Sequence, residues 1–134
     1  MTEGLLVVDT SAVLTALAAD PPARGLVDRL ENGGELGAPH LVDLELLSAL
    51  RRRVSLGELS IDRATDIRSD FAELALTRYP HEPLNDRIWE LRENLTAYDA
   101  SFVALAEILD VPLVTCDAAL AAAPGASEVA ELFV

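Results

Sequence analysis

Leu5-Leu6-Val7-Val8-Asp9-Thr10-Ser11 is the stretch that decides the fold. Its first four residues form a short continuous apolar run, which is typical of a buried parallel strand. An acid and two hydroxyl residues follow at once, and Thr10 or Ser11 is expected to cap a helix over residues 12–19. The stretch therefore predicts the first strand–helix unit of an α/β fold.

The rest of the chain alternates between helical and strand patterns. Helices are predicted over residues 21–31, 41–56, 61–76, 84–93, 97–110 and 117–122. Strands are predicted over residues 35–38, 78–81 and 111–115, with an edge strand within 128–133. This alternation predicts one α/β domain over residues 1–134, with a mostly parallel sheet of about four to five short strands flanked by helices.

Composition and charge exclude several classes of protein. The chain has 134 residues, of which 51% are hydrophobic, so it can build a core and is not disordered. The net charge of −13 opposes nonspecific nucleic-acid binding and favours a basic partner or bound cations. All ten basic residues are arginine, which excludes a P-loop and Schiff-base chemistry, since both need a lysine.

The sequence shows no targeting or redox feature. No apolar run reaches the roughly 18 residues of a membrane span, and no signal-peptide pattern opens the chain, so a cytoplasmic protein without a membrane segment is expected. The one cysteine, Cys116, excludes an intrachain disulfide and is interpreted as a small buried strand residue. His40 and His81 each stand beside a proline and are interpreted as loop residues.

Four carboxylates occur in apolar surroundings where acids are uncommon. Asp9 and Asp117 each close an apolar run that predicts a strand. Glu45 and Asp99 lie on predicted helices among apolar neighbours. An isolated buried carboxylate is costly, so it has to be protonated, paired or bound to a metal ion. Because sites in open α/β sheets form at the carboxyl ends of strands, we expect the four acids to surround one divalent-cation site.

Such a site would suit phosphodiester chemistry. Carboxylate oxygens are hard ligands that select Mg²⁺ or Mn²⁺. These ions activate water and neutralise phosphate charge, and nucleases commonly use two of them about 3.5–4 Å apart. The alternative is that the strand-end acids are helix caps and the other two are surface acids. Spacing alone leaves both interpretations open.

Segments around the same four acids carry a resemblance to a known family. They are Val8-Asp9-Thr10-Ser11-Ala12, residues 39–50 around Glu45, Tyr98-Asp99-Ala100 with Leu105-Ala106-Glu107, and Pro112-Leu113-Val114-Thr115-Cys116-Asp117. In order and spacing they resemble the PIN-domain ribonucleases, specifically the VapC-type toxins of bacterial toxin–antitoxin systems. The resemblance extends over nearly the whole chain.

The resemblance implies a PIN domain that is a Mg²⁺- or Mn²⁺-dependent endoribonuclease, the toxin of a type II toxin–antitoxin system. Metal-activated water would hydrolyse an RNA phosphodiester bond. The family's metal-binding and catalytic acids fall on Asp9, Glu45, Asp99 and Asp117. Its hydroxyls near the metal and phosphate fall on Ser11 and Thr115. Whether Glu45 completes the metal shell or orients the attacking water stays open.

The same resemblance implies partners. It implies a homodimer and a cognate VapB-like antitoxin, whose C-terminal segment wraps around the toxin and often places an arginine in the acidic pocket. The net charge of −13 fits such a partner. One departure concerns the metal: many relatives carry an acidic or polar residue just after the last aspartate, where this chain has Ala118 and Ala119. A second ion is therefore expected to be weakly held.

Arginines are the candidate RNA contacts. Arg51, Arg52 and Arg53 form a basic cluster that either complements the end of a helix dipole or contacts RNA phosphates. Arg87 precedes Trp89 on a predicted helix and is a further candidate for RNA contact. Trp89 itself is expected in the core or in a dimer interface.

Two other classes of function have some support in the sequence. Aspartate-nucleophile phosphatases and receiver domains also place acids at strand ends, but both use a lysine, which this chain lacks. Such a phosphatase would also have a second acid where Ser11 stands. The remaining alternative is a catalytically silent PIN-like protein-interaction module, which metal-dependent RNA cleavage would distinguish from the nuclease.

Overall fold

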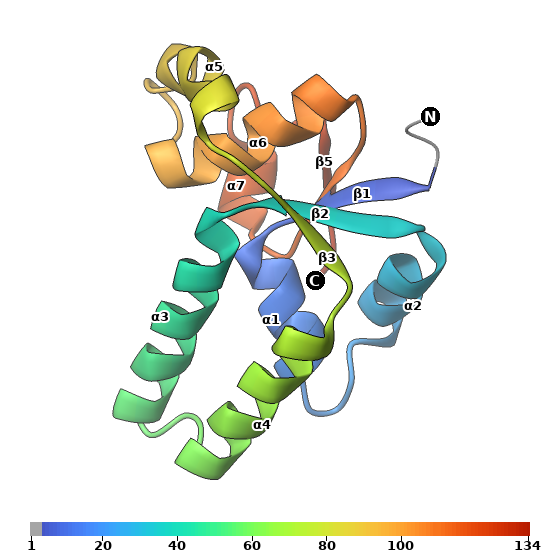
Figure 1. Cartoon of the computed structure of the whole chain (residues 1–134), viewed down its shortest axis with the longest axis vertical. Helices are drawn as coiled ribbons and strands as arrows, with labels where there is room; N and C mark the ends of the chain where they lie inside the picture. Colours follow the sequence, from blue (N-terminus) through green and yellow to red (C-terminus); the bar gives the residue numbers. More distant parts are fainter. Residues whose placement is uncertain (1–3) are drawn as a thin grey trace.

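A five-stranded, entirely parallel sheet organises the molecule (Figure 1). The computed structural model describes residues 4–134. The strands are β1 (Leu5–Val8), β2 (Glu35–Pro39), β3 (Leu76–Tyr79), β4 (Leu113–Thr115) and β5 (Ala130–Leu132), in the spatial order β3-β2-β1-β4-β5. The predicted α/β class, the parallel sheet and the edge strand near the end of the chain are confirmed.

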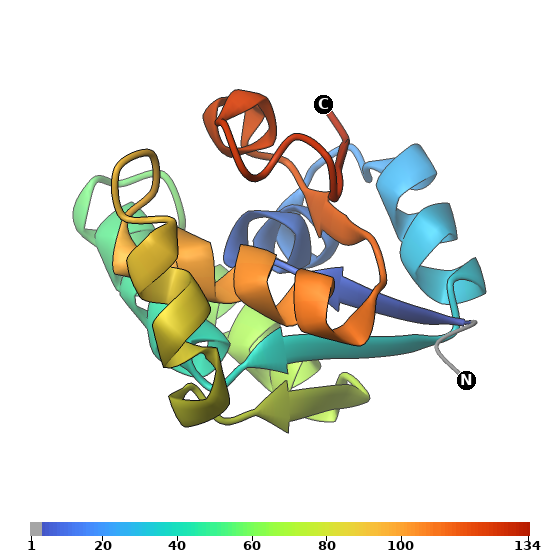
Figure 2. The ribbon, with the colours of Figure 1, turned by 90° about the horizontal axis from the view of Figure 1, so that it is seen from above.

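Helices cover both faces of this sheet. They are α1 (Thr10–Ala18), α2 (Arg24–Asn32), α3 (Leu41–Ser55), α4 (Ile61–Glu73), α5 (Asn85–Glu90) after the 3₁₀ turn η1 (Glu82–Leu84), α6 (Ala97–Leu109) and α7 (Ala118–Ala122). In Figures 1 and 2, α5 and α6 lie on one side of the sheet, and α1, α2 and α4 lie on the other. The chain changes sides between β3 and β4, because that connection crosses back over β2 and β1.

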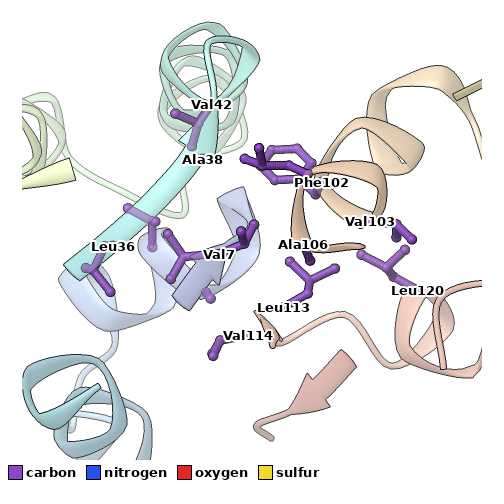
Figure 3. Close-up of a cluster of buried hydrophobic side chains, with 14 of the residues drawn as sticks. Val7, Leu36, Ala38, Val42, Phe102, Val103, Ala106, Leu113, Val114 and Leu120 are labelled. Atoms are coloured by element: carbon purple, nitrogen blue, oxygen red, sulfur yellow. The ribbon is translucent and has the colours of Figure 1, made fainter. Parts of the chain in front are cut away.

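The core sits between β1, β4 and α6 (Figure 3). Val7 on β1 and Leu113 on β4 are fully buried, and Phe102 of α6 is 1% exposed. Each such side chain contributes roughly 1.5–3 kcal/mol by burial. The elements that carry Asp9, Asp99 and Asp117 are therefore rigidly anchored.

Two helix starts differ from the sequence predictions. Helix α1 begins at Thr10, because Asp9 is its N-cap and accepts a hydrogen bond from the Ala12 backbone N–H at 2.8 Å. The expectation that Thr10 or Ser11 would cap this helix is wrong. Helix α2 begins at Arg24 rather than at residue 21, since Ala23 before it has a non-helical backbone (φ −80°, ψ 80°).

The bounds of strand β3 and of helices α4 and α5 also differ from the predicted ones. Strand β3 begins at Leu76 rather than at residue 78, because it pairs with β2 from Leu36↔Leu76 to Pro39↔Tyr79. Helix α4 consequently ends at Glu73 instead of near residue 76. Helix α5 ends at Glu90, three residues before its predicted end.

Trp89 on α5 is 68% exposed, so the prediction that it could lie in the core is wrong.

Among residues 4–134, no helix is long and apolar enough to span a membrane.

Candidate functional site

The carboxyl ends of β1 and β4 define the site. The two strands are parallel neighbours with Val8 opposite Val114, so the residues that follow them lie side by side. The chain leaves β1 toward β2 and leaves β4 toward β5, in opposite directions along the sheet, which makes this the switch point where α/β proteins place their sites. Asp9 follows β1 directly, and Asp117 follows β4 after one residue.

The four predicted acids surround one cavity of about 910 Å³. Glu45 reaches it from α3, and Asp99 reaches it from the first turn of α6, where Thr96 caps the helix. Asp9 and Asp117 complete the acidic part of the lining. We call Asp9, Glu45, Asp99 and Asp117 the cavity acids. The expectation that they would surround one site is met by this geometry.

Asp9 is the most constrained of the cavity acids. It is 5% exposed, and its Oδ1 accepts hydrogen bonds from Ser11 Oγ at 2.7 Å and from the Ala12 backbone N–H. Its Oδ2 accepts a short hydrogen bond of 2.5 Å from Thr115 Oγ1. Ser11 Oγ in turn accepts the backbone N–H of Cys116 at 2.9 Å. Ser11 and Thr115 therefore tie the ends of β1 and β4 together through Asp9.

These two hydroxyls occupy different places. Ser11 lines the cavity, whereas Thr115 is fully buried behind Asp9 and does not. Thr115 Oγ1 also accepts the backbone N–H of Asp117 at 3.0 Å, so one buried hydroxyl fixes both strand-end acids. Asp117 caps α7 through its Oδ1, which accepts backbone N–H groups of Ala119 and Leu120. The two strand-end acids are thus helix caps as well as cavity residues.

Glu45 has a partner that the sequence interpretation missed. Thr10 Oγ1 donates a 2.6 Å hydrogen bond to Glu45 Oε1, joining the start of α1 to the middle of α3. Thr10 also lines the cavity. Its position directly after the strand-end Asp9 is the one sequence signal that could have drawn attention to it.

The sequence is similar to a known family and to named relatives. The PIN domain family matches residues 6–126. The chain belongs to the PIN-domain family. Over 113 residues it is 47% identical to "Ribonuclease VapC9" of Mycobacterium tuberculosis, an alignment that covers 84% of this chain and 86% of the relative. Over 120 residues it is 46% identical to "Ribonuclease VapC1" of the same species, covering 89% and 90%. These identities place the chain in the VapC group.

A solved structure shares the fold. The structure of VapBC2 from Rickettsia felis, bound to a DNA fragment from its promoter, matches with a TM-score of 0.67. The match covers 97% of this chain and 99% of the other, at 14% sequence identity. This likeness shows the PIN fold alone.

Mutual repulsion links the cavity acids of this PIN domain. Burial is the main cause that raises the pKa of Asp9, Glu45 and Asp99. The charge of Asp117 raises the pKa of Asp9 and of Asp99 further. The pKa of Glu45 is raised also by Asp99 and Asp9, although the Thr10 hydrogen bond opposes this. Asp9, Glu45 and Asp99 are therefore harder to ionise than exposed carboxyl groups.

The donor set fits a hard divalent cation. All the acidic donors are oxygen atoms, and in residues 4–134 none of the ion pairs with arginine involves a cavity acid. In that same part of the chain, no three acidic, histidine or cysteine side chains lie close enough together to hold one ion directly. Because Mg²⁺ keeps several waters and takes one or two protein carboxylates, the cavity suits an ion bound partly through water.

The structure separates the candidate arginines. Arg52 and Arg53 line the cavity, seven and eight residues after Glu45 on the same face of α3. Arg51 points elsewhere and lines a groove between α3 and α4. Arg87 lies away from the cavity, where its guanidinium binds both oxygens of Glu107 at 2.8 and 3.1 Å. Only two of the four candidate RNA contacts therefore share the cavity with the acids.

Proposed function

We propose that this chain is a VapC-type toxin that hydrolyses RNA phosphodiester bonds with the help of bound Mg²⁺ or Mn²⁺. The observation that carries the proposal is the single cavity in which four carboxylates meet without an arginine partner among the described residues. The relatives at 46–47% identity are named ribonucleases, which supports the same activity. We place this activity in the cytoplasm, within one PIN domain over residues 1–134.

Asp9, Asp99 and Asp117 would hold the ion, directly or through water. When bound, the ion would supply an activated water and positive charge for the phosphate. Asp9 already shares its oxygens with Ser11, Ala12 and Thr115, so Asp99 and Asp117 are the better direct ligands. Thr115 would keep Asp9 ionised and oriented, because its hydrogen bond favours the carboxylate.

Glu45 would orient the attacking water. Thr10 holds its Oε1, which leaves Oε2 to accept a hydrogen bond from a water in the cavity. Burial and neighbouring acids raise the pKa of Glu45, which makes it a better proton acceptor than an exposed glutamate. Arg52 and Arg53 would bind phosphates on either side of the cut, since they are the cationic groups that line the cavity.

The test is cleavage of a labelled total RNA pool by antitoxin-free protein in Mg²⁺ or Mn²⁺. EDTA and the Asp99→Asn variant should each abolish cleavage, because one removes the ion and the other removes a ligand. Asp62→Asn, which changes an exposed acid in the first turn of α4, is the matched control and should cleave like wild type. Equal cleavage by wild type and Asp99→Asn would overturn the proposal. Silence of all proteins on every RNA would favour the catalytically silent interaction module.

We further propose a VapB-like antitoxin and a homodimer as partners. The cavity acids can accept an arginine guanidinium from the antitoxin in place of the metal, because a cation relieves their mutual repulsion. Co-expression with a cognate VapB-like antitoxin should give a stable complex that no longer cleaves RNA. Light scattering of the toxin alone tests the dimer.

A further inference from the structure

Two large side chains with apolar surface lie at the solvent side of the cavity. Tyr98 on α6 and Leu44 on α3 are 62% and 67% exposed, yet both line the cavity. Each directly precedes a cavity acid, Asp99 or Glu45. An exposed residue that also lines a cavity lies at its solvent side. The carboxylates are therefore flanked, on two different helices, by large apolar side chains at the entrance.

The Tyr98 ring is placed for contact with a ligand. Tyr98 lies one turn before Phe102 on α6, and Phe102 lines the same cavity although it is nearly fully buried. Two aromatic residues of α6 thus line the cavity, one of them buried and the other exposed. Leu44 adds apolar surface from α3, on the helix that also carries Arg52. Carboxylates, cations and an aromatic ring thereby share one cavity.

The other strongly exposed aromatic residue provides a contrast. Trp89 on α5 is 68% exposed, but it does not line the cavity, and the Arg92 guanidinium lies 4.6 Å from its ring centre. A cation over the ring face is a common resting contact for an exposed tryptophan. Among the described residues, Tyr98 has no comparable cation or ring over its face. Exposure alone therefore does not distinguish Tyr98, but exposure at the acidic cavity does.

We propose that Tyr98, supported by Leu44, is a stacking site for one unpaired nucleobase of the RNA, next to the phosphate that is cut. This inference rests on the proposed function and adds to it a residue that binds an RNA base. The three kinds of lining match the three parts of a nucleotide chain: the acids and their ion for the scissile phosphate, Arg52 and Arg53 for neighbouring phosphates, and the ring for a base.

A stacking site here selects RNA that is unpaired at the cut. In a duplex both faces of a base are covered by its neighbours, whereas loops and single strands can place a base on an aromatic ring. Stacking tolerates all four bases, so the ring would set structure preference more than sequence. It also adds affinity without positive charge, which matters for a chain of net charge −13.

The experiment is a binding cycle in EDTA, where metal-dependent cleavage is absent. A fluorescent single-stranded RNA is compared with versions that lack one base at successive positions, using wild type and Tyr98→Ala. Removal of one particular base should weaken wild-type binding by about tenfold. Tyr98→Ala should bind the intact RNA about tenfold more weakly and lose its sensitivity to that base, because the two changes remove the same contact. Tyr98→Phe keeps the ring and should bind like wild type.

Two controls separate stacking from other effects. Trp89→Ala should leave binding and base dependence unchanged. Raising the salt concentration should weaken all binding but leave the ratio of wild type to Tyr98→Ala constant, since stacking releases no counterions.

The outcomes also distinguish this inference from the nuclease proposal. Base-dependent binding through Tyr98 without any cleavage in Mg²⁺ would keep the stacking site and overturn the nuclease. Cleavage with no base position that matters, or equal base dependence in wild type and Tyr98→Ala, would overturn the stacking site. An absence of RNA binding by wild type would overturn it as well.

Discussion

Carboxylates at the edges of the molecule form ion pairs with arginine, whereas carboxylates in the cavity do not. At the edges, Arg78 holds Asp43 through two hydrogen bonds of 2.7 Å, and Arg29 holds Glu131 through two of 2.9 Å. These hydrogen bonds lower the pKa of both acids. Asp43 links α3 to β3, and Glu131 links β5 to α2, so each pair fastens one element to another.

In the cavity the arrangement is reversed. Burial and like charge raise the pKa of Asp9, Glu45 and Asp99, and no ion pair of the described residues relieves them. Arginines form ion pairs with the edge acids, whereas Arg52 and Arg53 line the cavity without forming an ion pair to a cavity acid. The difference supports the proposal that the cavity acids bind a cation from outside the chain.

The largest effect is expected for Asp117→Asn, which distinguishes the helix-capping role of Asp117 from its proposed role as a metal ligand. Asp117→Asn removes the charge, but asparagine caps helices as well as aspartate does, so α7 should stay intact. RNA cleavage should fall by about 100-fold or more, since even changes outside the direct metal shell cost about 10- to 100-fold. Cleavage rates and thermal unfolding are measured on the same samples. Full activity in Asp117→Asn would make this acid a cap and nothing more.

Thr115→Val tests the buried link between the two strand ends. The change is nearly isosteric but removes the donor to Asp9 Oδ2, leaving a buried carboxylate oxygen unsatisfied. We expect a loss of about 1–3 kcal/mol in the free energy of unfolding, measured in urea. Metal affinity should fall by about 10- to 100-fold, because the oriented, ionised form of Asp9 is no longer favoured. Thr115→Ser restores the donor and should recover the affinity, which a purely steric role of Thr115 would not predict.

Asp43→Asn breaks an edge pair and should leave the chemistry untouched. Loss of this part-exposed ion pair should cost about 1 kcal/mol in the free energy of unfolding at pH 7. The folded state lowers the pKa of Asp43, so its contribution is present above the usual value of 3.8 and is lost as pH falls through the lowered one. Urea unfolding at several pH values measures this difference. If Asp43→Asn reduced cleavage as much as Asp117→Asn does, the edge and cavity acids would not differ in function as proposed.

Asp99→Asn should slightly raise the free energy of unfolding, whereas Asp43→Asn lowers it, and this is the smallest of the expected effects. The folded state raises the pKa of Asp99, so the ionised side chain is unfavourable at pH 7, and its cost disappears as pH falls through the raised value toward 3.8. Without metal, the variant should therefore be more stable than wild type at pH 7, by no more than about 1 kcal/mol because solvent screens this half-buried group. Calorimetry at pH 7 and pH 4 checks the sign. A variant less stable than wild type at pH 7 would mean that Asp99 has a favourable partner.

Local patterns in the sequence were sufficient for most of the fold. The apolar run at residues 5–8 is β1 as predicted, and Thr96 and Ser60 cap the helices that they precede. The start of β3 was predicted wrongly because the deciding contact is distant along the chain. Strand β3 starts at Leu76 because β2 lies beside it, and no local pattern fixes that register.

In the candidate site, too, contacts between distant residues could not be predicted from the sequence. The acids could be found because carboxylates among apolar residues are rare, and their gathering followed from the carboxyl ends of parallel strands. The bond from Thr10 to Glu45 joins residues 35 positions apart and had no comparable signal. Arg51, Arg52 and Arg53 appeared as one cluster. At about 100° per residue, however, Arg52 and Arg53 fall within about 80° of Glu45 around the helix, whereas Arg51 falls about 120° away.

The most direct test is calorimetric titration of metal-stripped protein with Mn²⁺ and Mg²⁺, comparing wild type, Asp99→Asn and Asp43→Asn. Wild type and Asp43→Asn should bind the ion with equal affinity, because Asp43 lies outside the proposed metal site. Asp99→Asn should bind the ion at least about tenfold more weakly, because Asp99 is a proposed ligand. Equal binding by all three proteins, or no binding by wild type at millimolar ion, would contradict the account.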